Sequence, residues 1–190
     1  MVPEETRLGR VDDGQLVLRA RNGCQAAVDE LARRYRAGVY LTARRIVGNA
    51  GRAEDVAQEA LLIALRALPT LADPARFGAW LGAITRHRAR RVVRQECRFV
   101  PLEPAHLDQM RSPEAPSPDG LAEALAELGE EYQTVLRLRY WEEWPVGQIA
   151  AFLALPITTI KWRLHYAREV LRRRLNRDRK EEEDNGKHSV

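Results

Sequence analysis

Residues 145–164, PVGQIAAFLALPITTIKWRL, decide the fold of the C-terminal part of the chain. Their apolar residues recur at helical spacing on both sides of Ala154, which predicts a short helix over residues 146–153 and a longer one over residues 158–175. The residues positioned to pack where these helices cross are Ile149, Ala150, Leu153, Ile160 and Leu164. Two helices at this spacing, joined by about three residues, are typical of a helix-turn-helix motif.

The second helix of this motif has a polar and cationic outer face, formed by Thr159, Lys161, Trp162, Arg163 and Tyr166. The face mixes side chains that bind phosphate with side chains that read base edges, as a helix in the DNA major groove requires. The alternative is an ordinary pair of bundle helices, which needs no such face, so DNA binding is favoured. Ala154 stands where such turns usually have glycine, and a positive φ there would cost alanine about 1 kcal/mol.

The chain before this motif has the same helical periodicity and none of the alternation of a strand. Apolar stripes predict helices over residues 28–46, over residues 52–68 and from Phe77 into a basic run that ends at Arg98. Phe77 and Trp80 share their apolar phase with Ile84, so we expect them in the core rather than stacked on bases. This part is therefore predicted to be a helical bundle.

Between the two helical parts, the sequence changes character. Residues 101–119 hold five of the ten prolines and carry a net charge of −3, and such a segment cannot pack a core. We predict an all-α protein of two small helical domains, residues 12–98 and 120–176, joined by a linker over residues 99–119. A disordered, charged tail is expected over residues 177–190.

Composition and charge exclude several classes of protein. The net charge is +4, but residues 1–100 alone carry +7, which suits a polyanionic partner. Cys24 and Cys97 belong to no CxxC or Cys/His cluster, so neither a disulfide framework nor a zinc module is predicted. No segment resembles a secretory signal or a bilayer span, and no nucleophile and base occur as a pair. We expect a cytoplasmic protein without membrane insertion, metal, cofactor or catalytic residues.

Residues 85–98 form a second candidate site, with six arginines and one acidic residue. On a helix, Arg86, Arg90 and Arg94 share one face and Arg91 lies beside it, so the like charges repel one another unless an anion binds. A solvated face is the alternative reading. The run lacks the acidic residues that would neutralise it, which favours nucleic acid as its partner.

A third pattern lies in the helix expected over residues 52–68. Asp55, Gln58, Glu59 and Leu62 follow one another at helical spacing on the face opposite the apolar stripe. Taken alone, these residues indicate only a polar helix face.

Together, the helical domain, the Pro-rich linker and the helix-turn-helix domain resemble a bacterial sigma factor of the extracytoplasmic-function (ECF) group, which has regions two and four only. DVAQE at residues 55–59 resembles the family's D-x-x-Q-E motif. The resemblance implies that Asp55, Gln58, Glu59 and Leu62 dock on the clamp helices of the β′ subunit of core RNA polymerase. Region four would contact the β flap, and an anti-sigma factor is a further partner that the resemblance implies.

The resemblance also implies two contacts with promoter DNA. FGAWL at residues 77–81, with Ile84 and Arg86, resembles the helix that contacts the minus-ten element, and a flipped base would be captured near the loop at residues 71–73. The residues implied there are Leu71, Asp73, Arg86, His87, Arg90 and Arg91. The helix from Thr159 resembles the one that reads the minus-thirty-five element.

Four positions depart from the family pattern. His87 replaces the usual asparagine, Arg91 replaces an acid, Gly129 replaces a proline and Trp162 replaces a small polar residue. These departures concern the promoter sequence that the chain prefers. Two rival hypotheses remain: a stand-alone helix-turn-helix regulator, which would bind duplex DNA without polymerase, and an all-helical adaptor that binds only protein.

Overall fold

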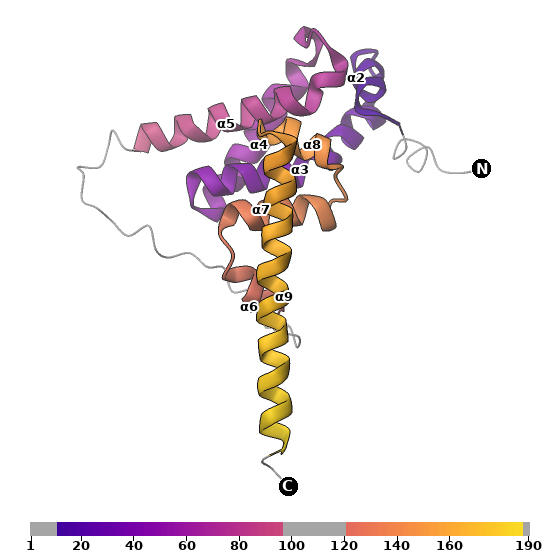
Figure 1. Cartoon of the computed structure of the whole chain (residues 1–190). Helices are drawn as coiled ribbons and strands as arrows, with labels where there is room; N and C mark the ends of the chain where they lie inside the picture. The colour runs from indigo at the N-terminus through magenta and orange to yellow at the C-terminus, as the bar shows by residue number, and fades with distance from the viewer. Residues whose placement is uncertain (1–10, 97–120, 188–190) are drawn as a thin grey trace.

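The computed structural model describes residues 11–96 and 121–187, except for the side chains of Glu96, of residues 122 and 123 and of residues 177–187. Within these ranges the regular structure is helical, without a strand, which confirms the predicted all-α class. The linker expected over residues 99–119 lies outside the described residues. The elements are α2 (Asp13–Arg21), α3 (Gln25–Val47), α4 (Ala50–Arg66), η1 (Leu68–Thr70), η2 (Pro74–Arg76), α5 (Phe77–Glu96), α6 (Leu121–Ala126), α7 (Glu130–Tyr140), α8 (Val146–Leu153) and α9 (Ile157–Lys187) (Figure 1).

The helices α2 to α5, together with η1 and η2, form an N-terminal bundle around α3, which contacts α2, α4 and α5. The apolar stripe of α3 is buried as its spacing predicts, with Leu31, Tyr35 and Val39 in the core. Phe77 is also in the core and Trp80 packs against it, which confirms that both are structural residues.

Local sequence signals explain where these helices begin and end. Gly48 ends α3 with a φ of 78°, a left-handed conformation that glycine adopts without strain. The Asn49 side chain then accepts a hydrogen bond from the backbone N–H of Arg52 at 3.1 Å and so caps the start of α4. Because of this cap, α4 begins two residues earlier than its apolar stripe alone predicts.

The helices α6 to α9 form a C-terminal bundle that contains the predicted helix-turn-helix, α8 and α9. The residues predicted to pack between these two helices are all buried: Ile149, Ala150, Leu153, Ile160 and Leu164. Ala154 ends α8 with a φ of 55° and a ψ of 46°, so the left-handed turn forms without glycine. Such a conformation costs an alanine about 1 kcal/mol.

Helix α9 is longer than the sequence predicts. Instead of ending near Leu175, its backbone continues to Lys187, through most of the segment expected to be a disordered tail. In Figure 1 this part of α9 projects beyond the other helices. Glu, Lys and Arg, which dominate the segment, are good helix formers, so a solvent-exposed helix is compatible with the same composition.

The two bundles share one apolar core, because α8 lies against α5 and α7 lies against α3. Trp144, between α7 and α8, covers Gly38 of α3 so closely that a Cβ at Gly38 would overlap the indole ring. Only 4% of Trp144 is exposed. In the described part of the chain, no helix combines the length and the apolar character that crossing a membrane requires.

Candidate functional site

The outer face of α4 carries the residues that the D-x-x-Q-E pattern singles out. Asp55 and Gln58 are exposed, and Leu62 shows 53% of its surface to solvent. Glu59 differs from them, because its carboxylate forms an ion pair with Arg88 of α5. The structure thus leaves three of the four predicted residues available to a partner and ties the fourth to the adjacent helix.

The loop between α4 and α5 is more constrained than the sequence indicates. Leu71 is only 8% exposed and belongs to the core, while its carbonyl oxygen accepts a hydrogen bond from the Arg21 guanidinium. The Asp73 carboxylate accepts a hydrogen bond from the backbone N–H of Ala75 at 3.0 Å and so caps η2. In this arrangement the Asp73 side chain is exposed to solvent, whereas the Leu71 side chain is buried in the core and turned away from any base outside it.

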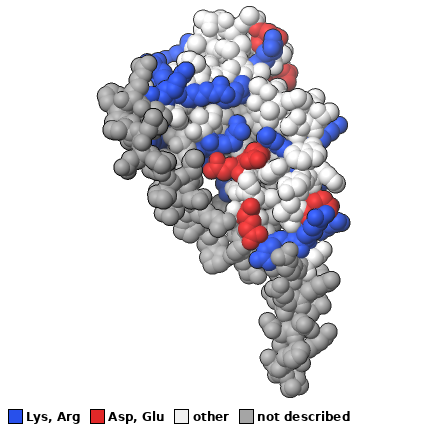
Figure 2. Space-filling model, turned by 60° about the vertical axis from the view of Figure 1, so that its left-hand side comes forward, with Lys and Arg blue, Asp and Glu red and all other residues white. Residues whose placement is uncertain are grey.

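Along α5, the predicted basic residues separate into two groups. His87, Arg90 and Arg91 are exposed. Arg86 is half-buried and donates a hydrogen bond to the carbonyl oxygen of Phe152, at the end of α8. On the face in Figure 2, basic side chains gather in separate bands with acidic ones between them.

The surroundings of Arg86 explain its electrostatics. Burial lowers the pKa of its guanidinium, and the neighbouring charges of Arg90 and Arg45 lower it further. Gly82, one helical turn before Arg86, lies so close to the Phe152 carbonyl that a Cβ would overlap the oxygen. The end of α8 therefore covers this part of the minus-ten face predicted from the sequence.

Helix α9 packs on α6, α7 and α8 of its own bundle. Lys161, Trp162 and Tyr166 are exposed, and Thr159 and Arg163 are half-buried. Opposite them, Ile160 and Leu164 fix the helix on the core. The structure thus gathers all five predicted residues on one helix, as a groove-reading surface requires.

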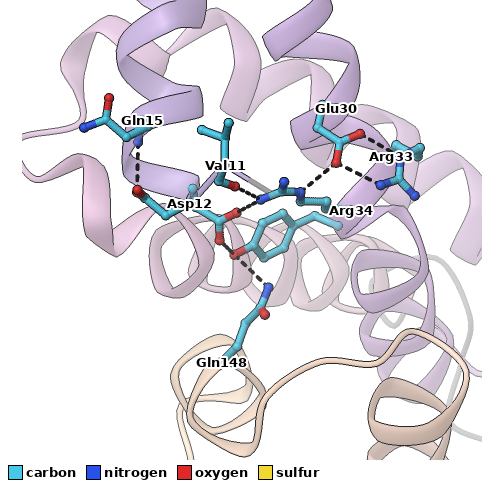
Figure 3. A network of polar contacts seen from close by, with 9 residues as sticks. Val11, Asp12, Gln15, Glu30, Arg33, Arg34 and Gln148 are labelled. Carbon is cyan, nitrogen blue, oxygen red and sulfur yellow. Dashed lines mark hydrogen bonds and ion pairs between the residues drawn. The ribbon is translucent and has the colours of Figure 1, made fainter. Parts of the chain in front are cut away.

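A polar network at the start of the N-terminal bundle was not predicted from the sequence (Figure 3). Glu30 accepts hydrogen bonds from Arg33 and Arg34, and Arg34 also pairs with Asp13 at 3.0 Å. The hydrogen bond from Arg33 lowers the pKa of Glu30 despite its burial. The spacing of Glu30, Arg33 and Arg34 is a helical signal that could have revealed these pairs.

Tyr35 connects this network to the C-terminal bundle. Its hydroxyl donates to the Asp13 carboxylate and accepts a hydrogen bond from Gln148 Nε2 of α8 at 3.2 Å. Burial, followed by the charge of Asp13, raises the pKa of Tyr35 above its ordinary value. No sequence signal links Tyr35 to Gln148, because these residues are 113 positions apart.

Chemically, these faces can bind anions and protein surfaces. Across the described ranges, His, Cys, Asp and Glu side chains form no group of three that could hold a metal ion. Cys24, at the start of α3, is a free thiol. The arrangement therefore offers exposed cationic, aromatic and carboxylate side chains for recognition.

Two family models match this chain, one in each bundle. The family model for Sigma-70 region 2 matches residues 31–99, and that for Sigma-70, region 4 matches residues 124–173. The chain is 36% identical over 142 residues to the ECF RNA polymerase sigma factor SigL of Mycobacterium tuberculosis, with 68% of this chain and 78% of SigL covered.

Two further similarities extend over more of the chain. The chain is 25% identical over 176 residues to the ECF RNA polymerase sigma factor SigW of Bacillus subtilis, with 84% of this chain and 94% of SigW covered. The solved structure of CnrH in complex with the cytosolic domain of CnrY matches with a TM-score of 0.53 and 25% identity, covering 87% of this chain and 98% of that one.

Proposed function

Since this chain belongs to the extracytoplasmic-function group of RNA polymerase sigma factors, we propose that α4 binds core polymerase and that α5 and α9 direct it to promoters. The observation that carries this proposal is the order of the two matched regions, each with an exposed face where the family motif lies. Binding and recognition, rather than catalysis, are its role, and we place its work in the cytoplasm.

For polymerase binding, the proposal assigns Asp55, Gln58 and Leu62 to the β′ clamp helices. Two polar groups beside an exposed leucine combine hydrogen bonding with apolar burial, which suits a helix-to-helix contact. Glu59 joins them once its pair with Arg88 is exchanged for a partner group. The C-terminal bundle is assigned to the β flap.

For the minus-ten element, the proposal assigns the exposed residues Asp73, His87, Arg90 and Arg91. Arginines bind the phosphates of a separated strand, while Asp73 and His87 offer polar groups to an extruded base. Leu71 supports this loop from the core. Arg86 takes part when its hydrogen bond to Phe152 is released.

For the minus-thirty-five element, the proposal assigns the outer face of α9. Lys161 is placed on phosphate and Arg163 on a base edge, with Thr159, Trp162 and Tyr166 completing the contact. We also infer that a regulatory protein binds this chain, since the similar CnrH was solved with the cytosolic domain of CnrY bound.

Reconstitution with core RNA polymerase tests the proposal. The purified chain should co-elute with core polymerase and support initiation from promoters selected from a random library, whereas core polymerase alone should not. A stand-alone regulator would bind duplex DNA without polymerase, as a dimer on paired half-sites. Failure to associate with core polymerase, or retention of protein partners only, would refute the sigma-factor role.

A further inference from the structure

The outer face of α9 carries an unusual apolar surface, the aromatic cluster formed by Tyr132, Trp162 and Tyr166. Trp162 and Tyr166 are stacked, with ring centroids 5.5 Å apart and planes inclined by 19°. Tyr132 of α7 supports both rings, at 4.9 Å from Tyr166 and 6.1 Å from Trp162. Exposed Trp and Tyr rings held in this way mark a binding surface rather than a solvated one.

The helical geometry places Trp162 at the centre of this face. Ile160, Leu164 and Ala167 form the buried stripe of α9. Successive residues are about 100° apart around a helix, so Trp162 lies roughly 200° from Ile160, on the opposite side. It is 55% exposed, and Tyr166 is 44% exposed. A recognition helix with this stripe on its core would point Trp162 at the floor of the major groove.

The chemistry of the groove limits what such a ring can recognise. An indole has a single N–H donor and no acceptor, so most of its surface can make only apolar contacts. Among the base edges in the major groove, the C5 methyl group of thymine is the apolar feature. Phosphate binding falls to neighbouring cations, and Lys161 lies exposed beside Trp162.

Resting on the proposed role of α9 at the minus-thirty-five element, we infer that Trp162, supported by Tyr166 and Tyr132, selects thymine there by contact with its C5 methyl group. In the structure, α8 packs on α5 and α7 packs on α3, which we call the closed arrangement. These contacts involve α8 and α7 rather than this face of α9, so Trp162 stays exposed and supported by the tyrosine rings in the closed arrangement. Trp162 thus determines specificity, and Tyr132 is a positioning residue.

The first step of the test is promoter selection with the complete holoenzyme. Wild type and the Trp162→Ser variant are each combined with core polymerase and given a library randomised in the upstream element. Wild type should select thymine, on either strand, at a position where the variant has no preference. Trp162→Phe keeps an apolar ring and should retain that preference. Because Trp162 is exposed, its replacement should leave the helical signal in the far-ultraviolet circular dichroism spectrum unchanged.

The second step removes only the methyl group. Replacing the selected thymine with uracil should weaken wild-type binding about fourfold, the factor that corresponds to one buried methyl-sized group. The Trp162→Ser holoenzyme should bind both templates equally. Lys161→Ala is the matched control, since loss of a phosphate contact should weaken binding to both templates alike and leave the fourfold ratio intact.

Each other outcome overturns a defined part of the argument. Identical selected sequences for wild type and Trp162→Ser, or no effect of uracil, would refute the methyl contact while promoter-specific initiation stands. Weakened binding to polymerase without a change in selection would make the aromatic cluster a protein-docking surface instead. If the wild-type chain directs no promoter-specific binding at all, the proposed function fails and this inference fails with it.

Discussion

Helices α5 and α9 each carry a proposed DNA face, but the structure treats the two faces differently. On α9 the central residue, Trp162, is exposed, and its ring packs on Tyr132 and Tyr166 of its own bundle. On α5 the end of α8 covers Gly82, and Arg86 bonds to the Phe152 carbonyl. Under the proposed assignment, the α9 face is open to upstream DNA while α8 packs on α5, whereas Gly82 and Arg86 of the minus-ten face are uncovered only when α8 leaves α5.

The contact that makes this difference depends on small residues of the N-terminal bundle. Gly38 and Gly82 have no Cβ, which lets Trp144 and the Phe152 backbone approach α3 and α5. Substitutions at this contact, compared with substitutions inside one bundle, separate the effect of the contact between the bundles from that of local stability.

Gly82→Ala should cause the largest change in the structure, because it separates α8 from α5. The new Cβ would overlap the Phe152 carbonyl oxygen, a backbone atom that cannot rotate aside. The N-terminal bundle should stay folded, since alanine favours a helix over glycine by about 1 kcal/mol. Small-angle X-ray scattering should show a larger radius of gyration.

The matched control for this change is Gly147→Ala. Gly147 lies in α8, and a Cβ there would meet open space, so the variant should keep the wild-type scattering curve. A Gly82→Ala protein with the same scattering curve as wild type would show that the α5–α8 contact does not define the shape in solution.

Glu30→Gln should be next in size, and the contacts that it changes lie within the N-terminal bundle. The Glu30 carboxylate is buried and accepts hydrogen bonds from Arg33 and Arg34, and hydrogen bonds to a charged group contribute about 1.5–3 kcal/mol. Thermal unfolding should therefore begin at a lower temperature. A variant as stable as wild type at neutral pH would contradict this account.

The same residue predicts a dependence on pH. Hydrogen bonding to Arg33 lowers the pKa of Glu30 in the folded protein. The stabilisation is therefore complete above the ordinary pKa of glutamate and is lost as the pH falls through the lowered folded value. Wild type should lose stability over this acidic range, and the Gln variant should lose less. Parallel slopes for the two proteins would argue against the assignment.

Tyr35→Phe should remove two hydrogen bonds of about 1 kcal/mol each, of which the one from Gln148 links the bundles. The ring and its packing on Trp144, at 5.1 Å between centroids, remain, but Asp13 and Gln148 lose their shared partner. Chemical denaturation measures the loss. Gln148→Ala in the Tyr35→Phe background should add little, and full additivity would show that the two residues are not coupled.

How much of the structure could be predicted from the sequence depends on how far apart along the chain the contacting residues lie. Helix periodicity predicted the core position of Phe77 and the exposed Trp162, because each follows from neighbours within a few turns. It placed Arg86 on a DNA face but could not reveal Phe152, 66 residues away. Helix periodicity does not distinguish a glycine such as Gly82, where another helix approaches, from one that faces solvent.

Ala154→Gly should stabilise the C-terminal bundle by up to about 1 kcal/mol and leave the N-terminal bundle unchanged. Ala154 has a φ of 55°, which glycine adopts without a steric penalty, although glycine also gains entropy in the unfolded chain. The measurement is the melting temperature together with α9 binding to upstream DNA. A lower melting temperature would mean that the entropy of glycine outweighs the relief of strain.

The smallest change in stability is expected from Asp55→Ala combined with Gln58→Ala, within about 0.5 kcal/mol of wild type. Both side chains are exposed on the face of α4 away from the core. Binding to core polymerase should nevertheless fall clearly, with the contact between the bundles and the closed shape retained. Unchanged affinity for core polymerase would refute the assignment of this face to the clamp helices.

Glu59→Ala supplies the contrast that makes this last result interpretable. Its carboxylate is paired with Arg88, so its removal also leaves a partly buried guanidinium without that partner. This variant should lose both affinity and stability, whereas the double variant should lose affinity alone. Of the two variants, only the Asp55→Ala, Gln58→Ala protein keeps the ion pair between α4 and α5. Comparing the stability and the polymerase affinity of the two variants therefore distinguishes residues that bind polymerase from a residue that also holds the N-terminal bundle together.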